Sequence, residues 1–439
     1  MGASSGWKLF LGWLNGTKFH FIVFANGRRA QELPLGADKN QSKPELMRRA
    51  MEHLQLERLR KTYADGTQAV RDVSFGVGHK EAVFLLGPSG AGKTTTLRLV
   101  AGLEHADAGE IRIAGSDVTH RTPGARNVAM VYDKHSLFPH LSVKENLAYP
   151  LRVRKMSAAD VDTRVAAVAQ TLQISEQLEK MPSQLSAGQM QRVAIGRALV
   201  RDADVFLLDE PISHLDAQLR ARMRVEFKRL QREYNATMLY VSHDQLEAMT
   251  MADRIVLINQ GQVEQIDEPQ KIFDRPETLF CATFIGEPAM NVLPAVLTGV
   301  GDGRTIAIEG TPIEVDRGWF EHGGPPLDPA ERYLLGARPQ HLSLAAPDSS
   351  AAGLVKGTVF AVEILGSRVV FHVEFGRSIL RVLTSVDEAR RHNSDIGAPI
   401  AVRFGPRHIY LFSQSTGRTV RQALFTETSP SSGRPAVPN

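Results

Sequence analysis

Several features that often indicate a protein's class are scarce in this sequence of 439 residues. Cysteine occurs once, as Cys281, which excludes an intramolecular disulfide framework and fits a reducing compartment; we expect it to be a small buried hydrophobe. An uninterrupted apolar run of the ~18 residues that a membrane-spanning helix needs is missing, so a membrane role would require a partner. The net charge is only +4 and is spread along the chain, so no nucleic-acid partner is expected.

Residues 1–50 form an N-terminal extension in which we find no recognisable chemistry. The apolar stretch Trp7 to Leu14 is not expected to be a signal peptide, because Lys18 and His20 interrupt it and no small-residue cleavage site follows. Two interpretations stay open. The extension is either a short accessory segment or the product of a start codon placed too early, since Met47 or Met51 would begin the next domain cleanly.

The most specific motif has the spacing G-x-x-x-x-G-K-T and reads Gly87-Pro88-Ser89-Gly90-Ala91-Gly92-Lys93-Thr94. It follows the apolar run Ala82 to Leu86 and precedes a good helix start at Thr95. Such a loop binds phosphate, because its glycines let backbone N–H groups turn onto an anion and the next helix directs its positive end there. We expect Lys93 to reach the β- and γ-phosphates of a nucleoside triphosphate and the Thr94 hydroxyl to bind magnesium.

Acidic residues follow a second apolar run, Val205 to Leu208. This pattern predicts a buried parallel strand that delivers Asp209 and Glu210 to its carboxyl edge, where open α/β sheets bind ligands. Asp209 would hold magnesium through water, and Glu210 would polarise the attacking water. A further strand, Thr237 to Val241, ends just before His243, which could reach a γ-phosphate but taken alone reads as an ordinary loop histidine.

Two other segments are candidates for nucleotide contact. Leu54 to Val77 alternates around a turn at 64–66 and predicts an antiparallel hairpin. Tyr63, just before that turn, could stack on a purine, although a lone tyrosine more often packs in a core. Ser186 and Gly188 begin a predicted helix that runs through Leu199, and its outward-facing N–H groups make a second potential anion site.

The remaining pattern divides the chain further. Helical periodicity from Ser142 to about Ile174, with Pro150 and Pro182 as breaks, predicts a helical insertion between parallel strands. From residue 286 to about 415 the segments are short and alternating, which predicts a small barrel-like all-β domain. The Ser- and Pro-rich tail, 416–439, is expected to be disordered.

These elements, in this order, resemble the ATP-binding subunit of an ABC transporter. The most specific part is Leu185-Ser186-Ala187-Gly188-Gln189, about 20 residues before the acidic strand. The resemblance implies an α/β P-loop NTPase domain with a helical insertion over 51–285, with ATP and Mg²⁺ as cofactors. It assigns Lys93, Glu210 and His243 to catalysis and Thr94, Asp209 and Asp133 to the metal. It implies that the nucleotide is bound by Tyr63, by Gly87 through Thr95, and by Asp133, Ser186, Gly188 and Gln189.

Residues 281 to 415 narrow the resemblance to carbohydrate importers of the maltose and glycerol-3-phosphate type. The segments that carry it are 284–291, 335–342 and 404–412. The resemblance implies a small all-β OB-like (TOBE-type) regulatory domain over 286–415 and ATP hydrolysis that powers uptake of a sugar, polyol or glycerol phosphate. The location would be peripheral, at the cytoplasmic face of a bacterial inner membrane.

The resemblance also implies partners. A second ATP-binding subunit, in a homodimer or heterodimer, would place its Ser186 helix against each ATP. Closure of this dimer would be transmitted to two transmembrane permease subunits, and a periplasmic substrate-binding protein would act indirectly. A soluble ABC protein acting on DNA or ribosomes is a weaker alternative, because it predicts a second nucleotide domain or a long coiled coil, and the sequence has neither.

Two positions depart from the family pattern. Ala187 replaces a glycine, a mild change, because Ser186, Gly188 and Gln189 are the residues expected to touch phosphate. Asp133 stands where the family normally has glutamine; it keeps an oxygen for a metal but loses the amide donor and adds negative charge. An alternative function is therefore a regulatory subunit with impaired hydrolysis that pairs with a different ATPase subunit.

Overall fold

The computed structural model describes residues 8–14, 17–23, 31–32, 52–132, 136–298, 305–313, 327–328, 330–349 and 353–422. The chain divides into two units, 1–52 and 53–439. In the first unit, β1 (Lys8–Leu14), β2 (Thr17–Val23) and β3 (Gln31–Glu32) form an antiparallel sheet. These strands were not predicted from the sequence.

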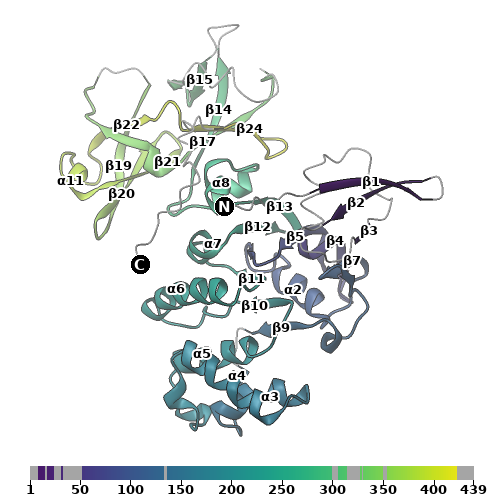
Figure 1. Ribbon diagram of the computed structural model, residues 1–439. Coiled ribbons are helices and arrows are strands. Elements are labelled where there is room, and N and C mark those ends of the chain that lie inside the picture. The colour runs from purple at the N-terminus through teal and green to yellow at the C-terminus, as the bar shows by residue number, and fades with distance from the viewer. Residues whose placement is uncertain are drawn as a thin grey trace, which may run out of the picture. The chain divides into compact units, whose positions relative to one another are not determined.

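A six-stranded sheet with the order β13-β12-β6-β11-β10-β9 lies at the centre of the second unit (Figure 1). Its strands are β6 (Ala82–Leu86), β9 (Val128–Val131), β10 (Val205–Asp209), β11 (Met238–Ser242), β12 (Arg254–Asn259) and β13 (Gln262–Asp267). All neighbours run parallel except the antiparallel pair β12 and β13. In β6, Phe84 faces one core and Leu85 the other, so the strand is buried on both faces, as is typical of a parallel sheet.

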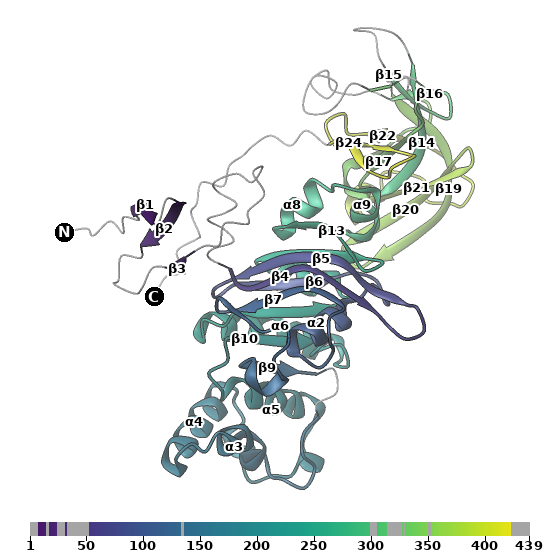
Figure 2. The same cartoon turned by 90° about the vertical axis from the view of Figure 1, so that its right-hand side faces the viewer.

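A second, four-stranded sheet has the order β5-β4-β7-β8. It consists of β4 (Glu52–Thr62), β5 (Gln68–Gly78), β7 (Ala108–Ile113) and β8 (Ser116–Asp117). The turn between β4 and β5 is closed by hydrogen bonds from Tyr63 N to Thr67 O and from Gly66 N to Tyr63 O, both 2.9 Å, which confirms the predicted hairpin. Helix α2 (Lys93–Ala101) packs against β5 of this sheet and against β10 and β11 of the central one (Figure 2).

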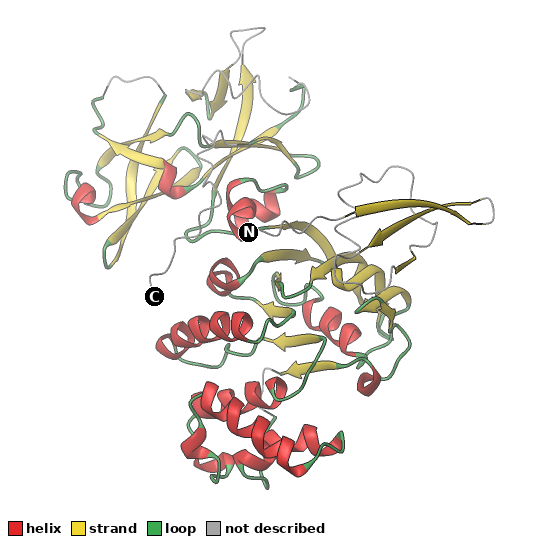
Figure 3. Cartoon of the chain, viewed as in Figure 1, coloured by secondary structure: helices red, strands yellow, loops and turns green. Residues whose placement is uncertain are grey.

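The chain between β9 and β10 is largely helical, as predicted (Figure 3). It contains α3 (Val143–Val153), α4 (Ala158–Thr171) and α5 (Ala187–Leu199). Pro150 was expected to break the helix, and that expectation is wrong, because Pro150 lies inside α3. The helix ends at Val153, within one turn, so the backbone hydrogen bond that proline removes is lost near a terminus.

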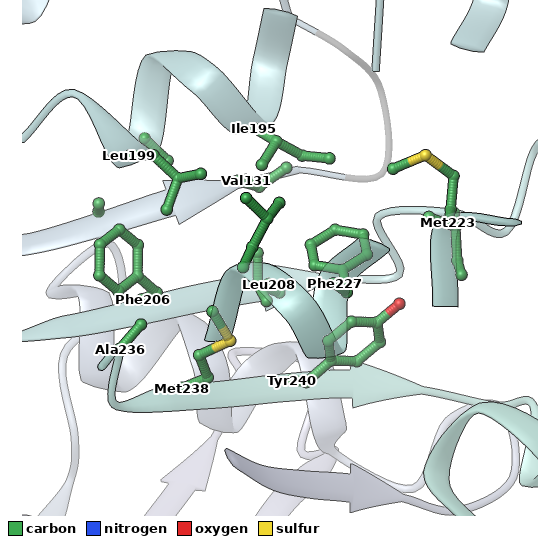
Figure 4. Close-up of a cluster of buried hydrophobic side chains, with 14 of the residues drawn as sticks. Val131, Ile195, Leu199, Phe206, Leu208, Met223, Phe227, Ala236, Met238 and Tyr240 are labelled. Carbon is green, nitrogen blue, oxygen red and sulfur yellow. The ribbon is translucent and has the colours of Figure 1, made fainter. Parts of the chain in front are cut away.

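The other helices of this half follow β10. They are α6 (Ala217–Glu233), α7 (Gln245–Met251), α8 (Pro269–Asp274) and α9 (Leu279–Phe284). Figure 4 shows the core that α5 and α6 share with the central sheet, where Leu199 and Phe227 meet Phe206, Leu208 and Tyr240. Cys281, on α9, is fully buried, which confirms its expected place in a core.

Beyond residue 290 the described chain consists mainly of antiparallel strands, which confirms the all-β prediction. One sheet has the order β16-β15-β14-β17-β23-β24 and the other β18-β22-β19-β20-β21. The first contains β14 (Asn291–Thr298), β15 (Thr305–Ile308), β16 (Thr311–Ile313), β17 (Tyr333–Ala337), β23 (Ile409–Ser413) and β24 (Thr419–Arg421). The second contains β18 (Leu342–Ala345), β19 (Leu354–Leu365), β20 (Arg368–Phe375), β21 (Ser378–Ser385) and β22 (Pro399–Phe404), and the short helix α11 (Val386–Ala389) follows β21.

Strand β24 lies inside the segment 416–439 that the sequence predicted to be disordered, so that prediction is wrong for its first residues. The strand pairs with β23, and Thr419 N donates to the carbonyl oxygen of Glu277 at 3.0 Å. Backbone pairing therefore orders a stretch whose composition alone favours disorder. Residues 423–439 lie outside the described part of the chain.

Candidate functional site

The phosphate-binding loop connects β6 to α2, and two of its glycines are required by close backbone contacts. A Cβ atom at Gly87 would lie 2.1 Å from the carbonyl oxygen of Ile258, and one at Gly92 would lie 2.1 Å from that of Ala69. Gly92 also caps α2 with a φ of 97°, in the left-handed region that favours glycine. Ser89 and Gly90 are exposed at the loop's tip. The strands β12 and β5 thus contact one side of the loop, and the tip of the loop is exposed to solvent.

Lys93 lies beneath this loop. Its Nζ donates hydrogen bonds to the carbonyl oxygens of Gly87 and Pro88, both at 2.9 Å, and the residue is only 6% exposed. Burial lowers the pKa of Lys93, while the nearby carboxylates of Glu210 and Asp209 oppose that shift. The ammonium group is therefore held at the loop by acceptors that stabilise its charged form.

Two of the three residues predicted to bind magnesium, Thr94 and Asp209, contact each other. The hydroxyl of Thr94, in the first turn of α2, donates to Oδ1 of Asp209, at the end of β10, over 3.2 Å. Asp209 is 7% exposed. Parallel strands bring their carboxyl ends to one edge of the sheet, which explains why an acid after β10 meets the loop after β6.

Glu210 and His243 also meet at this edge. Nδ1 of His243 lies 3.0 Å from Oε2 of Glu210. Glu210 has a φ of 45°, a left-handed conformation that costs a residue with a side chain about 1–2 kcal/mol. Its N–H donates to the carbonyl oxygen of Val241, and its own carbonyl oxygen accepts from the backbone and hydroxyl of Ser213. The surrounding backbone therefore holds Glu210 in a strained conformation beside the phosphate loop.

Tyr63 is close to the same helix. Its hydroxyl lies 3.3 Å from the hydroxyl oxygen of Thr95, and Lys61 Nζ lies over its ring, 5.6 Å from the centroid. These contacts place Tyr63 beside the first turn of α2, and its stacking on a base stays a prediction.

Ser186 begins α5, which packs against α3 and α4 of the helical insertion and against β9, the edge strand of the central sheet. Ser186 caps α5: its hydroxyl accepts from Gln189 N at 3.3 Å, and Gln189 Oε1 accepts from Ser186 N at 3.0 Å. This capping box satisfies an N–H group of Gln189 that the sequence suggested would face outward unpaired. Ser186 itself is exposed, so the start of α5 is open to another molecule.

Asp133 lies outside the described residues, so its predicted contact with metal and nucleotide stays a prediction. The residues on either side of the omitted segment are described. Tyr132 is partly exposed, and the carbonyl oxygen of Ser136 accepts a 2.7 Å hydrogen bond from Nη1 of Arg197, on α5. Arg197 therefore connects the helix that begins at Ser186 to the segment that follows Asp133.

Two buried charged residues were missed, one next to His243 and one at the end of α2 away from the phosphate loop. Glu247, on α7, accepts hydrogen bonds from the hydroxyls of Tyr240 and Ser242, next to His243. Arg126 donates to the carbonyl oxygens of Leu99 and Val100, in the last turn of α2, and so caps that helix from the side. The order Asp244-x-x-Glu247 at a helix start would have indicated the first, because it is a capping pattern.

Comparison with known proteins agrees with this geometry. A family model described as ABC transporter matches residues 70–213, and one described as TOBE domain matches residues 335–412. The sn-glycerol-3-phosphate import ATP-binding protein UgpC of Cereibacter sphaeroides is 44% identical over 84% of this chain and 99% of that protein. The trehalose import ATP-binding protein SugC of Mycobacterium tuberculosis is 45% identical over 67% of this chain and 74% of that protein.

Among solved structures, the chain is similar to a dimeric post-hydrolysis state of the ATP-binding cassette MJ0796 bound to ADP and Pi. The identity is 28% and the TM-score 0.45, over 49% of this chain and 98% of that one. The near-complete coverage of the UgpC relative, together with the two family models, decides the classification. The chain belongs to the family of ATP-binding subunits of ABC importers, which hydrolyse ATP to drive transport.

Proposed function

We propose that this chain binds Mg·ATP and hydrolyses it to energise uptake of a sugar, polyol or glycerol phosphate through a membrane permease. The observation that carries the proposal is the convergence of Thr94, Asp209, Glu210 and His243 beside Lys93 at one edge of the central sheet. The class of substrate comes from the relatives, which the names above describe as import proteins for glycerol 3-phosphate and trehalose.

The residues fit a magnesium nucleotide. Hydroxyl and carboxylate oxygens are the ligands that Mg²⁺ prefers, and Thr94 and Asp209 supply one of each within 3.2 Å. When bound, the ion would neutralise charge on the phosphates. Lys93 and the loop N–H groups would bind the phosphate oxygens, and Tyr63 would stack on the base. Glu210 would orient the attacking water and accept its proton, while His243 would hold Glu210 and the γ-phosphate in place.

The hydrolysis proposal can be tested with two variants of the full chain. Glu210→Gln keeps the size of the side chain but removes the carboxylate, so it is expected to bind ATP and to lose turnover. Lys93→Ala is expected to lose ATP binding itself. Equal ATPase rates for the wild type and Glu210→Gln would show that Glu210 has no catalytic role.

A second ATP-binding subunit is part of the proposal. Ser186 is exposed at the start of α5, a helix of 13 residues that packs in the helical insertion, whereas the phosphate loop packs against β12 and β5. The N-terminus of α5 suits phosphate, so a head-to-tail dimer would complete each site. Light scattering of Glu210→Gln with ATP is expected to show a dimer, and adding Ser186→Arg is expected to abolish it. A dimer that persists with Ser186→Arg would contradict this arrangement.

We also propose a docking surface for permease subunits, which would hold the chain at the cytoplasmic face of the inner membrane. Of the helices in the described ranges, none is long and apolar enough to cross a bilayer. A groove of about 320 Å³ lies on the helical insertion, lined by Tyr132, Phe138, Tyr149 and Arg197 among others. Exposed aromatic residues beside an arginine are typical of protein interfaces. Tyr149→Glu is expected to prevent permease assembly while ATP binding by the isolated chain is retained. Stable assembly of that variant would show that the groove is not the docking surface.

Asp133 supports one alternative, a subunit whose hydrolysis is impaired and which pairs with a different ATPase subunit. Compared with glutamine, its carboxylate is one methylene shorter, lacks an amide donor and adds negative charge near the triphosphate. On this hypothesis Asp133→Gln raises ATPase or transport. No change in either measurement would dismiss the hypothesis.

A further inference from the structure

The position of His243 depends on the backbone that carries it. Its side chain is 50% exposed, so packing alone does not fix the imidazole, and its Nδ1 contact with Glu210 is 3.0 Å. His243 lies in the turn between β11 and α7, with Ser242 before it and Asp244 after it. Whatever holds these two neighbours therefore also sets the reach of the imidazole toward Glu210.

Both neighbours of His243 are anchored by hydrogen bonds. The hydroxyl of Ser242 accepts from Asp244 N at 2.9 Å and donates to Oε2 of Glu247 at 2.8 Å. The Oδ1 atom of Asp244 accepts from Leu246 N at 2.8 Å and from Glu247 N at 3.2 Å. The turn is thus closed by a ring of hydrogen bonds, and the Glu247 carboxylate is the buried acceptor at which it ends.

Glu247 is itself rigidly held. It is 2% exposed, and the same Oε2 atom accepts the hydroxyl of Tyr240 at 3.2 Å. The Tyr240 ring stacks on the Phe84 ring, with centroids 4.2 Å apart. It also meets the Phe227 ring edge-on, with centroids 5.9 Å apart, and Figure 4 labels both of these rings. Because β11 carries Tyr240 and β6 carries Phe84, the carboxylate is tied to the central sheet.

A carboxylate is a costly group to bury at this place. Burial raises the pKa of Glu247, which means that the environment opposes its charge. If packing were the only requirement, an apolar residue of similar size would fill the space at lower cost. The two hydroxyl donors compensate part of the cost, and one of them, Ser242, belongs to the turn that carries His243.

We propose that Glu247 is a positioning residue that, through the hydroxyl of Ser242, fixes the turn carrying His243 at the distance from Glu210 that hydrolysis requires. The proposal rests on the function proposed above for His243 and Glu210. Glu247 does not reach the nucleotide in this role. It acts through His243, so replacing Glu247 should not lower kcat further when His243 has already been replaced.

A double-mutant cycle on the ATPase rate of the full chain tests this. Glu247→Ala lets the turn shift, and a misplacement of about 1 Å costs roughly 10²-fold in kcat, with KM for ATP unchanged. His243→Ala is expected to lower kcat as well, and the double variant is expected to match His243→Ala alone. Glu247→Gln keeps an acceptor oxygen for Ser242 and is expected to recover part of the rate. Thr250→Ala, on the exposed side of α7, is the matched control and is expected to retain the wild-type kcat.

The outcomes separate the alternatives. Losses that multiply in the double variant, or a rise in KM for ATP with kcat unchanged, would overturn the positioning role of Glu247. If Glu247→Ala does not fold, Ser242→Ala replaces it in the same cycle, and the same non-additivity is expected. A wild-type kcat for His243→Ala would instead remove the proposed role of His243, and with it the basis of this inference.

Discussion

The hydroxyl of Thr94 donates a 3.2 Å hydrogen bond to Oδ1 of Asp209, and this contact joins residues 115 positions apart in the sequence. It brings the first turn of α2 to the end of β10. The order of the parallel strands therefore brings together the two residues proposed to bind magnesium, since β6 and β10 both flank β11.

Replacing Asp209 by asparagine tests this ligand set. The change keeps the shape but removes the charge, and we expect a loss of about 10- to 100-fold in Mg²⁺ affinity or activity. The measurement is the ATPase rate against free Mg²⁺ at saturating ATP. Asp162→Asn, at an exposed ion pair with Lys144, serves as the control and is expected to leave the curve unchanged. A Mg²⁺ midpoint in Asp209→Asn equal to that of the wild type would argue against a metal role.

Gly87→Ala tests how tightly the loop is held. The added Cβ would lie 2.1 Å from the carbonyl oxygen of Ile258, so β12 must shift, and overpacking of this kind costs about 1–3 kcal/mol. Urea denaturation measures the loss. Gly124→Ala is the control, because a Cβ there meets nothing within 4 Å. Equal stability of the two variants would mean that the backbone around Gly87 accommodates a Cβ atom without loss of stability.

Much of the site could be predicted because its signals are local. The spacing of Gly87, Lys93 and Thr94 and the acids after an apolar run each fit in a short window, and the parallel strands bring them together. Arg338 could not be predicted, since its partners, the carbonyl oxygens of Ile285 and Phe273, come near it only through tertiary packing. Likewise, β24 is three residues long and is ordered by pairing with β23 and by Glu277, not by its own composition.

Replacing Arg338 tests how the hydrogen bonds between the ATPase half and the β-rich half contribute to stability. Its Nη1 donates to the carbonyl oxygen of Ile285 at 2.7 Å, its Nη2 donates to that of Phe273 at 2.5 Å, and the guanidinium lies 3.7 Å from the Phe273 ring centroid. Lysine cannot reproduce this planar fork, so Arg338→Lys should leave a buried carbonyl oxygen unpaired and cost about 1–3 kcal/mol.

Denaturant unfolding of Arg338→Lys provides the measurement. Arg377→Lys, at an exposed position, is the control and is expected to stay within about 0.5 kcal/mol of the wild type. If both variants unfold at the same denaturant concentration as the wild type, the fork at Arg338 does not stabilise the junction.

The stability of the protein should fall in mild acid because of His341. Burial, together with the nearby His408 and Arg338, lowers the pKa of His341 from 6.5 to about 4. Between these values the unfolded chain binds a proton that the folded chain does not, and this proton stabilises the unfolded state. The free energy of unfolding is therefore highest above pH 6.5 and decreases as the pH falls toward 4. The thermal midpoint of His341→Gln is expected to decrease less over this range. His120→Gln, at an exposed position, is the control, and parallel curves for wild type and His341→Gln would contradict the prediction.

ATP binding and turnover by Glu210→Gln, measured on the same preparation of the full chain, test the proposed function most directly. We predict that the variant retains ATP, forms a dimer in its presence and releases no phosphate, whereas the wild type hydrolyses ATP under the same conditions. Phosphate release by Glu210→Gln at the wild-type rate would contradict it.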